Sequence, residues 1–302
     1  MPAAYHTRVS RPLGTLAALF YIFLWASAYV PSKVGVLGSS PLWFLVVRFA
    51  TAGSLAVLLA LALRAPFPRT RRAWLTVVVL GVLGNAIYLG CTYEALRHLA
   101  SGLGAIVAST NPLVLALVAP WALREPLSVG KVAGLVLGFG GVLAIVLVRA
   151  GSGTAEPRDV ALAFVGVLAS VAATIVYKRW TTALDLRAVT GLQLLAAGVV
   201  VLPLAVLTEG APHAHWSWQL IVSFVYVVLV MSIGASLLWF WLLTHGEASR
   251  VSAYYFLTPV FGLALSALLL HEPVYWRDLI GLLAVAAGIT LVQRSVPGAT
   301  RS

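Results

Sequence analysis

Charged side chains are scarce in this 302-residue chain, and their scarcity decides the broad class of protein. Lys, Arg, Asp and Glu together make up 10% of the residues, hydrophobic residues make up 61%, and the mean hydropathy is +0.98. Soluble domains carry about 25% charged residues. The composition excludes an ordinary soluble protein and predicts an all-α integral membrane protein, whose helices satisfy their backbone polar groups internally.

Cysteine and membrane-buried acidic residues are also nearly absent. Cys91 is the single cysteine, so neither an intramolecular disulfide nor a cysteine metal site is expected. The nine carboxylates and six histidines fall at the ends of apolar runs or between them. An embedded enzyme would need clustered Asp, Glu or His at helical spacing. We therefore expect no enzyme, no metal, no cofactor and no proton relay at the membrane midplane.

Long apolar runs are what the sequence has in abundance. A helix needs about 20 mostly apolar residues to cross a hydrocarbon core of about 30 Å. The connections between the runs are short and leave no room for an extramembrane domain. Ten runs are expected to be transmembrane helices: 13–34, 40–63, 74–95, 102–122, 129–148, 160–178, 187–208, 218–243, 251–270 and 278–294.

The net charge of +11 indicates membrane orientation rather than a nucleic-acid partner. Ten spans place both termini on one side, and most basic residues, Arg69, Arg71 and Arg72 among them, fall in segments on that side. Positive residues concentrate in cytoplasmic segments. We expect a multi-pass protein of the cell inner membrane, with a cytoplasmic N-terminus at 1–12 and a cytoplasmic tail at 295–302.

The two halves of the chain resemble each other, which indicates an internal duplication. NPLVLALVAPWALREPL, from residue 111, aligns without a gap with TPVFGLALSALLLHEPV, from residue 258. The same offset pairs Gly134 with Gly281 and Gly141 with Gly288. We expect two five-helix repeats, 13–148 and 160–294, joined by an outer linker at 149–159.

An odd number of helices per repeat has a consequence for topology. The second repeat must enter the membrane in the opposite orientation, which makes the two units inverted repeats. Repeats related by an axis in the membrane plane are a transporter design, with the substrate site near the midplane between the halves.

Several short motifs carry a resemblance to a known family. Trp25–Lys33 reads W-x-S-x-Y-x-x-x-K, and R-F, Y-E-A-L, N-P, E-P and G-x6-G follow in successive helices of the first half. W-L-L, T-P, E-P and G-x6-G follow in the second. The order resembles the drug/metabolite transporter superfamily, of the type with two EamA-like repeats, which includes bacterial amino-acid exporters. Glu94 departs from the pattern, since the family usually has a neutral residue there.

The resemblance implies a transporter that works in the lipid bilayer, as a monomer, by alternating access around one central cavity. We expect it to export small amphiphilic metabolites, with aromatic and other apolar amino acids as the leading class. Two alternatives stay open: efflux of multiple drugs or cationic compounds, whose charge aromatic faces can bind, and a non-transporting membrane scaffold.

An aromatic stripe in the first helix is the main candidate for the cavity wall. Tyr21, Trp25, Tyr29 and Lys33 are four residues apart, which places them on nearly one face of a helix. Helix packing, with the Lys33 ammonium reaching the membrane surface, is the alternative. The other expected substrate-binding residues are polar or aromatic positions in four further helices: Asn85, Tyr88, Thr92, Ser109, Asn111, Ser236, Trp239, Ser252 and Tyr255.

Five residues are expected to have structural or gating roles: Pro31, Arg48, Glu94, Pro112 and Pro259. Pro31, Pro112 and Pro259 interrupt helical hydrogen bonding and release backbone carbonyls. Arg48 is the one full charge well inside a span, so it must face protein or water. It is expected to hold carbonyls or Glu94, although binding of a substrate carboxylate remains open.

Overall fold

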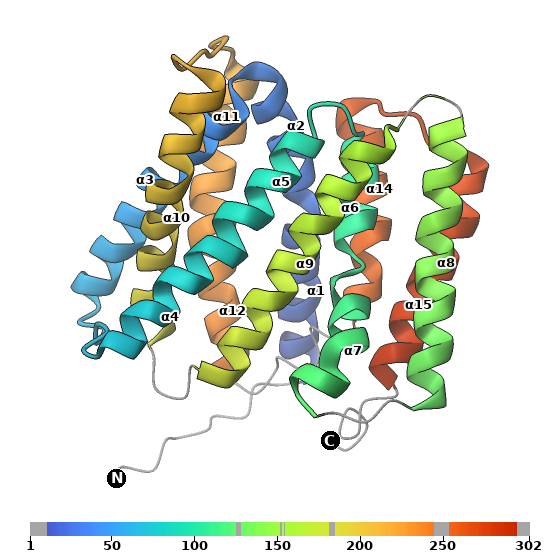
Figure 1. Cartoon of the computed structure of the whole chain (residues 1–302), viewed down its shortest axis with the longest axis horizontal. Helices are drawn as coiled ribbons and strands as arrows, with labels where there is room; N and C mark the ends of the chain where they lie inside the picture. The colour runs from blue at the N-terminus through green and yellow to red at the C-terminus, as the bar shows by residue number, and fades with distance from the viewer. Residues whose placement is uncertain are drawn as a thin grey trace.

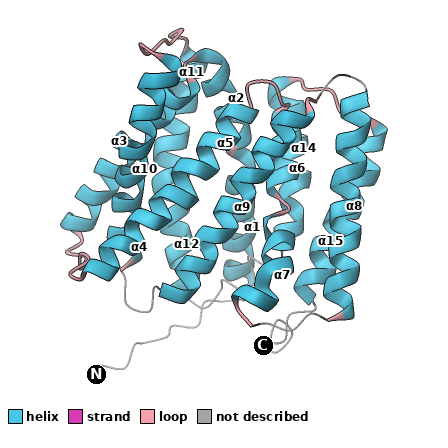
Figure 2. Cartoon of the chain, viewed as in Figure 1, coloured by secondary structure: helices cyan, strands magenta, loops and turns pink. Residues whose placement is uncertain are grey.

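Helices make up nearly all of the computed structural model (Figure 2), which describes residues 11–124, 128–151, 153, 155–180, 185–244 and 254–294. No strand occurs among these residues, where the one isolated β-bridge joins Ser39 and Ala214. The helices of the first half are α1 (Arg11–Ser27), α2 (Tyr29–Gly38), α3 (Pro41–Ala62), α4 (Arg71–Gly81), η1 (Val82–Ile87), α5 (Tyr88–Ala95), α6 (Ser101–Ala108), α7 (Asn111–Ala122) and α8 (Val129–Gly151). Those of the second half are α9 (Pro157–Trp180), α10 (Leu186–Glu209), α11 (Trp218–Val225), η2 (Tyr226–Gly234), α12 (Ala235–Thr244), η3 (Tyr255–Leu257), α14 (Thr258–Leu270) and α15 (Trp276–Arg294).

Membrane-crossing length is reached by nine helical segments of the described chain. Each corresponds to one of the expected runs, and several are formed by two or three consecutive helices, such as Pro12–Gly38, from α1 and α2, and Arg71–Ala95, from α4, η1 and α5. The run expected at 251–270 corresponds to a shorter apolar helical segment, Tyr255–Leu270, and residues 251–253 lie outside the described residues. An all-helical integral membrane protein is confirmed.

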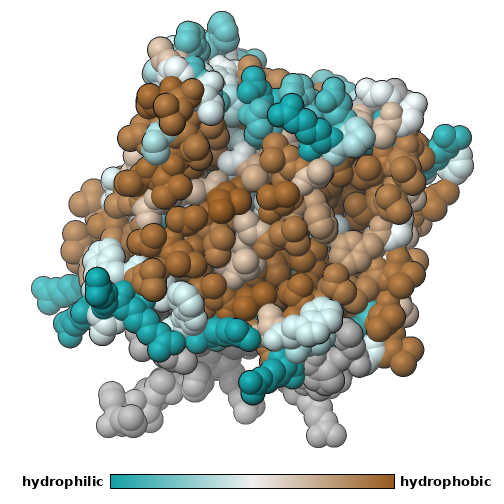
Figure 3. Space-filling view, in the orientation of Figure 1, coloured by the Kyte–Doolittle hydropathy of each residue, from teal (hydrophilic) through white to brown (hydrophobic). Residues whose placement is uncertain are grey.

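The surface pattern agrees with a membrane environment. Figure 3 shows a broad hydrophobic zone across the middle of the visible face, with hydrophilic residues at its two ends. In Figure 1, α1 begins and α15 ends at the lower end of the bundle, which we name the terminal end. The turn from α2 to α3 and the start of α11 lie at the upper end, which we name the opposite end.

Two long antiparallel helix pairs form the sides of the bundle. α3 packs along α10, and α8 packs along α15. Small residues permit the close approach, since a Cβ atom on Gly53 of α3 would lie 2.8 Å from Leu195 and one on Gly134 of α8 would lie 2.7 Å from the carbonyl oxygen of Gly288. Small residues at contacts are typical of helices that pack in membranes, where van der Waals contact drives association.

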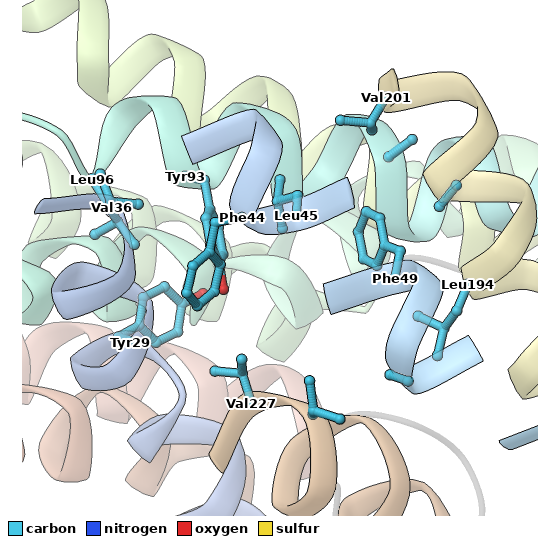
Figure 4. Close-up of a cluster of buried hydrophobic side chains, with 14 of the residues drawn as sticks. Tyr29, Val36, Phe44, Leu45, Phe49, Tyr93, Leu96, Leu194, Val201 and Val227 are labelled. Carbon is cyan, nitrogen blue, oxygen red and sulfur yellow. The ribbon is translucent and has the colours of Figure 1, made fainter. Parts of the chain in front are cut away.

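The buried core is largest around α2, α3, α5 and α10. Tyr29, Phe44 and Tyr93 lie together in the close-up of Figure 4, with Leu45 and Phe49 on the neighbouring turns. The rings of Phe44 and Tyr93 have centroids 5.9 Å apart. This packing holds the first half against α10 and fixes the hydroxyl of Tyr93 in the interior.

Helices extend past two of the expected segment boundaries. α8 continues to Gly151 and α9 begins at Pro157, so the expected linker 149–159 is helical at both ends. α1 begins at Arg11, within the expected N-terminal tail. In both cases a helix extends beyond the apolar run by polar or charged residues, which hydropathy alone does not include.

Candidate functional site

A cavity of about 220 Å³ lies inside the bundle. A cavity needs about 10–15 Å³, measured in the same way, to hold one water molecule, so this cavity has room for a much larger solute. It is lined by residues of α1, α2, α3, η1, α5, α10, η2 and α12. The lining residues are Tyr21, Trp25, Ala28, Tyr29, Ser32, Arg48, Gly84, Asn85, Tyr88, Leu89, Thr92, Tyr93, Thr190, Gln193, Leu194, Met231, Ser232, Ala235 and Ser236.

The aromatic wall of the cavity is formed by the first span. Tyr21, Trp25 and Tyr29 all line it, as their spacing of four predicted. The span is divided at Ala28, between α1 and α2, so the stripe crosses a small bend before Pro31. Pro31 is buried in the first turn of α2, where a missing N–H is tolerated.

Hydroxyl groups form a second feature of the wall. The hydroxyls of Tyr29 and Tyr88 are 3.2 Å apart and share a hydrogen bond. Ser32 Oγ donates to the Tyr93 hydroxyl over 3.0 Å. These contacts connect α2 with α5 and leave a cavity that is aromatic in bulk and polar at its hydroxyl tips, which suits an amphiphilic solute.

Arg48 brings a full positive charge to this wall. Its side chain is 7% exposed, and Nη1 donates to the Tyr93 hydroxyl over 2.8 Å. Moving an isolated arginine to the centre of a membrane costs at least about 2.5–3.5 kcal/mol on the insertion scale. The expectation that Arg48 holds Glu94 is wrong: Glu94, in the last turn of α5, pairs over 3.2 Å at the surface with Arg97, three residues further on.

Two π-helical segments occupy equivalent places in the two halves. η1 contributes Gly84 and Asn85 to the cavity, and η2 contributes Met231 and Ser232. The π-helix is rare and is frequent at functional sites, because its wider turn leaves backbone groups and side chains displaced from the regular α-helical pattern. Sequence periodicity did not predict either segment.

Lys33 lies outside the cavity lining, contrary to the expected stripe. Its ammonium donates to the carbonyl oxygens of Leu96, over 2.6 Å, and Leu99, over 2.9 Å. These carbonyls end α5 and begin the turn to α6, where a cation is favoured by the free C=O groups. These contacts hold the Lys33 ammonium outside the lining, although Lys33 follows Tyr29 by four residues in the same helix.

Other expected binding residues also lie away from the lining. Ser109 Oγ donates to the Ile106 carbonyl over 2.6 Å, and Asn111 donates to Ser170 Oγ over 2.9 Å. Both therefore satisfy polar groups where α6 ends and α7 begins at the Pro112 interruption. Tyr255 packs in two apolar clusters near the start of α14. Ser252 and the side chain of Trp239 lie outside the described residues.

Proline interruptions appear at both predicted breaks. Pro112 stands in the first turn of α7, directly after the gap between α6 and α7. Pro259 stands in the first turn of α14, directly after the 3-10 helix η3. Around the first break, the hydroxyls of Ser109 and Thr110 donate to the carbonyls of Ile106 and Val107, each over 2.6 Å, so these two carbonyls have side-chain donors.

Sequence reasoning missed several lining residues. Tyr93, Thr190 and Gln193 line the cavity without having been predicted. Gln193 had a usable signal, because an offset of 145 residues aligns the earlier helices of the two halves, pairing Gly53 with Gly198 and Arg48 with Gln193. Among the described residues, no group of three or more His, Cys, Asp or Glu could hold a metal ion.

An apolar helical bundle with a solute-sized central cavity has the architecture of a membrane transporter. The sequence model of the EamA-like transporter family matches residues 12–147 and again residues 158–294. The chain belongs to this family, which confirms the resemblance to the drug/metabolite transporter superfamily, and its role is transport rather than catalysis.

Two bacterial relatives support the assignment. The chain is 30% identical to the uncharacterized transporter YvbV of Bacillus subtilis (strain 168), over 92% of this chain and 90% of YvbV. It is 26% identical to the protein PecM of Dickeya dadantii (strain 3937), over 89% of each chain. A crystal structure with 15% identity covers 96% of this chain and 100% of its own, with a TM-score of 0.65, and shows the same fold.

Proposed function

We propose that this transporter exports small amphiphilic metabolites, with aromatic and other apolar amino acids as the leading class. The observation that carries the proposal is the central cavity, whose wall combines Tyr21, Trp25 and Tyr29 with a set of hydroxyl and amide groups. Rings contact an apolar side chain, and hydroxyls and amides contact its polar end. We further propose a monomer as the transport unit, because residues of both halves of the chain line the same cavity.

Alternating access between two inverted five-helix repeats is supported by the contact of α8 with α15. A Cβ atom on Gly134 would lie 2.7 Å from the Gly288 carbonyl oxygen, and one on Gly141 would lie 2.7 Å from that of Gly281. In the aligned halves, Gly288 is the copy of Gly141 and Gly281 is the copy of Gly134. Gly134 therefore faces the copy of Gly141, and Gly141 faces the copy of Gly134. Reciprocal contacts of this kind arise where a two-fold axis relates two elements, and here the axis is perpendicular to the two antiparallel helices.

Closure at the opposite end favours a cavity that opens toward the terminal end. Glu209 accepts hydrogen bonds from the backbone N–H groups of Leu42 and Trp43, each over 3.1 Å, and so connects α10 with the start of α3. A small adjoining cavity extends toward the terminal end between Leu63, at the end of α3, and Arg187, at the start of α10. With the termini in the cytoplasm, as the distribution of basic residues favours, this is an inward-facing state at the inner membrane.

A flux assay tests the proposal. Proteoliposomes with the full chain are loaded with labelled Phe, Thr or Met, and protein-dependent efflux of at least one is expected. Trp25→Ala should reduce efflux by about 10-fold or more, because removing a ring from an apolar contact costs on the order of 1–3 kcal/mol. Trp216→Ala, at an exposed position, is the matched control and should retain the wild-type rate.

Two results would redirect the function. Absence of protein-dependent efflux for all three amino acids would contradict the proposed class of substrate. If the same vesicles instead expel lipophilic cations, and cells gain drug resistance, the alternative of cationic drug efflux would replace it. A scaffold role is disfavoured by the cavity, because a scaffold has no use for a space of about 220 Å³ within its core.

A further inference from the structure

We propose that Arg48 binds a carboxylate on the transported solute, so that the substrates are monocarboxylates for which an ammonium group is optional. The inference rests on the proposed function, since it names the chemical group that the same cavity recognises. It is carried by the geometry around the guanidinium and by the composition of the cavity wall.

Arg48 is a buried cation without an acidic partner among the described residues. None of their carboxylates forms an ion pair with it, whereas Glu94, Asp185 and Asp278 each have an arginine partner. A buried charge is unfavourable unless it is paired and hydrogen-bonded. An anion that enters the cavity would supply the missing partner.

The guanidinium also keeps an unused hydrogen-bond donor. Arg48 Nε is buried and has no acceptor within hydrogen-bond distance. Trp25 Nε1 is a second buried donor of the cavity wall with no acceptor. Two donors on cavity-lining residues require acceptors, and a carboxylate offers two oxygens with about four lone-pair sites. Charge-assisted bonds of this kind are the strong ones, and the planar guanidinium matches a carboxylate.

Tyr93 positions the guanidinium for this contact. Its hydroxyl accepts from Arg48 Nη1 over 2.8 Å and from Ser32 Oγ over 3.0 Å, and its own side chain is 0% exposed. The buried ring fixes the hydroxyl, and the hydroxyl fixes one edge of the guanidinium. Tyr93 is therefore a positioning residue, while Arg48 is the residue that contacts the solute.

The described lining of the cavity favours a solute with one negative charge and contains no acidic side chain that would bind a positive one. Its described lining contains no Asp or Glu, so a cationic solute would meet Arg48 without a compensating carboxylate. Gln193, the counterpart of Arg48 in the second half, also lines the cavity and is a neutral amide. One cation and one amide fit a single carboxylate, and an ammonium would find only hydroxyls, amides and ring faces.

Three phenyl compounds separate these possibilities in a binding assay with the purified full chain. 3-Phenylpropionate has the carboxylate without the ammonium, 3-phenylpropionamide is its neutral counterpart, and 2-phenylethylamine has the ammonium without the carboxylate. We expect 3-phenylpropionate to bind about 10- to 100-fold more tightly than the other two, as one charge-assisted contact in a dry site allows.

The ratio of carboxylate to amide affinity is the decisive readout, because it does not depend on the amount of folded protein. Arg48→Gln should reduce the ratio to about 3-fold or less, Arg48→Lys should restore part of it, and Tyr93→Phe should lower it by roughly 3- to 10-fold. Arg277→Gln removes the same charge from the exposed surface and should leave the ratio unchanged.

The outcomes distinguish this inference from the proposed function. An unchanged ratio in Arg48→Gln, tight binding of 2-phenylethylamine, or no binding of 3-phenylpropionate would overturn the carboxylate site even if phenylalanine is transported. Arg48-dependent binding of 3-phenylpropionate without any flux of amino acids would support the site and contradict amino-acid export.

Discussion

Two buried arginines of this transporter lie in opposite electrostatic surroundings. Arg149, at the end of α8, is 2% exposed and contacts both carboxylate oxygens of Asp278, with Nη2–Oδ2 and Nε–Oδ1 distances of 2.7 and 3.2 Å. It also donates to the Pro273 carbonyl, and its guanidinium lies 5.4 Å from the centre of the Tyr275 ring. Arg48 is buried to a similar degree and has the Tyr93 hydroxyl as its side-chain partner.

The comparison distinguishes Arg149, whose charge stabilises the fold, from Arg48, whose charge we expect to act on the solute. The pair of Arg149 with Asp278 connects the two halves at the opposite end, where Asp278 also accepts from the backbone N–H of Tyr275. Its polar groups are satisfied by protein. Arg48 keeps an unsatisfied donor in a cavity wall, and such departures from full satisfaction concentrate at functional sites. The following changes test this contrast.

The largest loss of stability is expected for Asp278→Asn. It leaves the Arg149 guanidinium buried without a counter-charge, and breaking a buried pair in this way lowers the free energy of unfolding by about 3–5 kcal/mol. Chemical unfolding of the purified protein in detergent measures the change. Exchanging both partners for Met and Leu should recover most of the loss. A cost below about 1 kcal/mol for Asp278→Asn would show that the pair is not structural.

A smaller loss is expected for Glu272→Gln. Glu272 accepts from the N–H groups of Ser101, over 2.8 Å, and Gly102, over 3.2 Å, at the start of α6, and it also contacts Ser266. An amide keeps part of these bonds and loses the charge that favours a helix N-terminus, so about 1–2 kcal/mol is expected. The same unfolding experiment checks it. An unchanged midpoint would mean that this carboxylate does not stabilise the opposite end.

Arg48→Met is expected to separate stability from transport. Only the bond to Tyr93 is lost, and the uncompensated buried charge disappears, so the free energy of unfolding should change by less than about 1 kcal/mol in either direction. Efflux of labelled phenylalanine should fall by 10-fold or more. A loss of stability as large as that of Asp278→Asn would place Arg48 with Arg149 as a structural residue.

The smallest effect concerns an ion pair at the terminal end. Arg187, 2.6 Å from Asp185, lowers the pKa of the Asp185 carboxyl below its ordinary value, first through the side-chain hydrogen bond. The resulting stability is present above the unfolded-state pKa of about 3.9 and is lost as the pH falls through the lower folded-state value. Since the Arg187 side chain is 43% exposed, less than about 1 kcal/mol is expected. Asp185→Asn should remove this part of the pH dependence of unfolding, and an identical acid profile would contradict it.

Sequence periodicity predicted the parts of the structure that depend on local spacing. Apolar runs predicted the helices, and the spacing of four in the first span predicted the three rings of the cavity wall, Tyr21, Trp25 and Tyr29. The prediction failed one turn later, at Lys33, because its ammonium donates to carbonyls that follow the end of α5 and is held outside the lining. These carbonyls are far from Lys33 in the sequence.

Long-range partners were beyond the reach of sequence spacing. Nothing in the order of residues indicates that Arg48 meets Tyr93 rather than Glu94, since the choice depends on how α5 is rotated against α3. The π-helical turn of η1 directly precedes α5 and has no periodic signal. The alignment of the two halves did contain unused information, because the partner of Arg48 at position 193 also lines the cavity.

Counterflow of labelled phenylalanine in proteoliposomes tests the central claim most directly. Vesicles with the full chain, preloaded with unlabelled phenylalanine, should accumulate the label in a saturable manner. Trp25→Ala should reduce this accumulation, and Trp216→Ala should not. Accumulation no greater than in protein-free vesicles, or an equal loss in both variants, would contradict a solute pathway through the aromatic cavity.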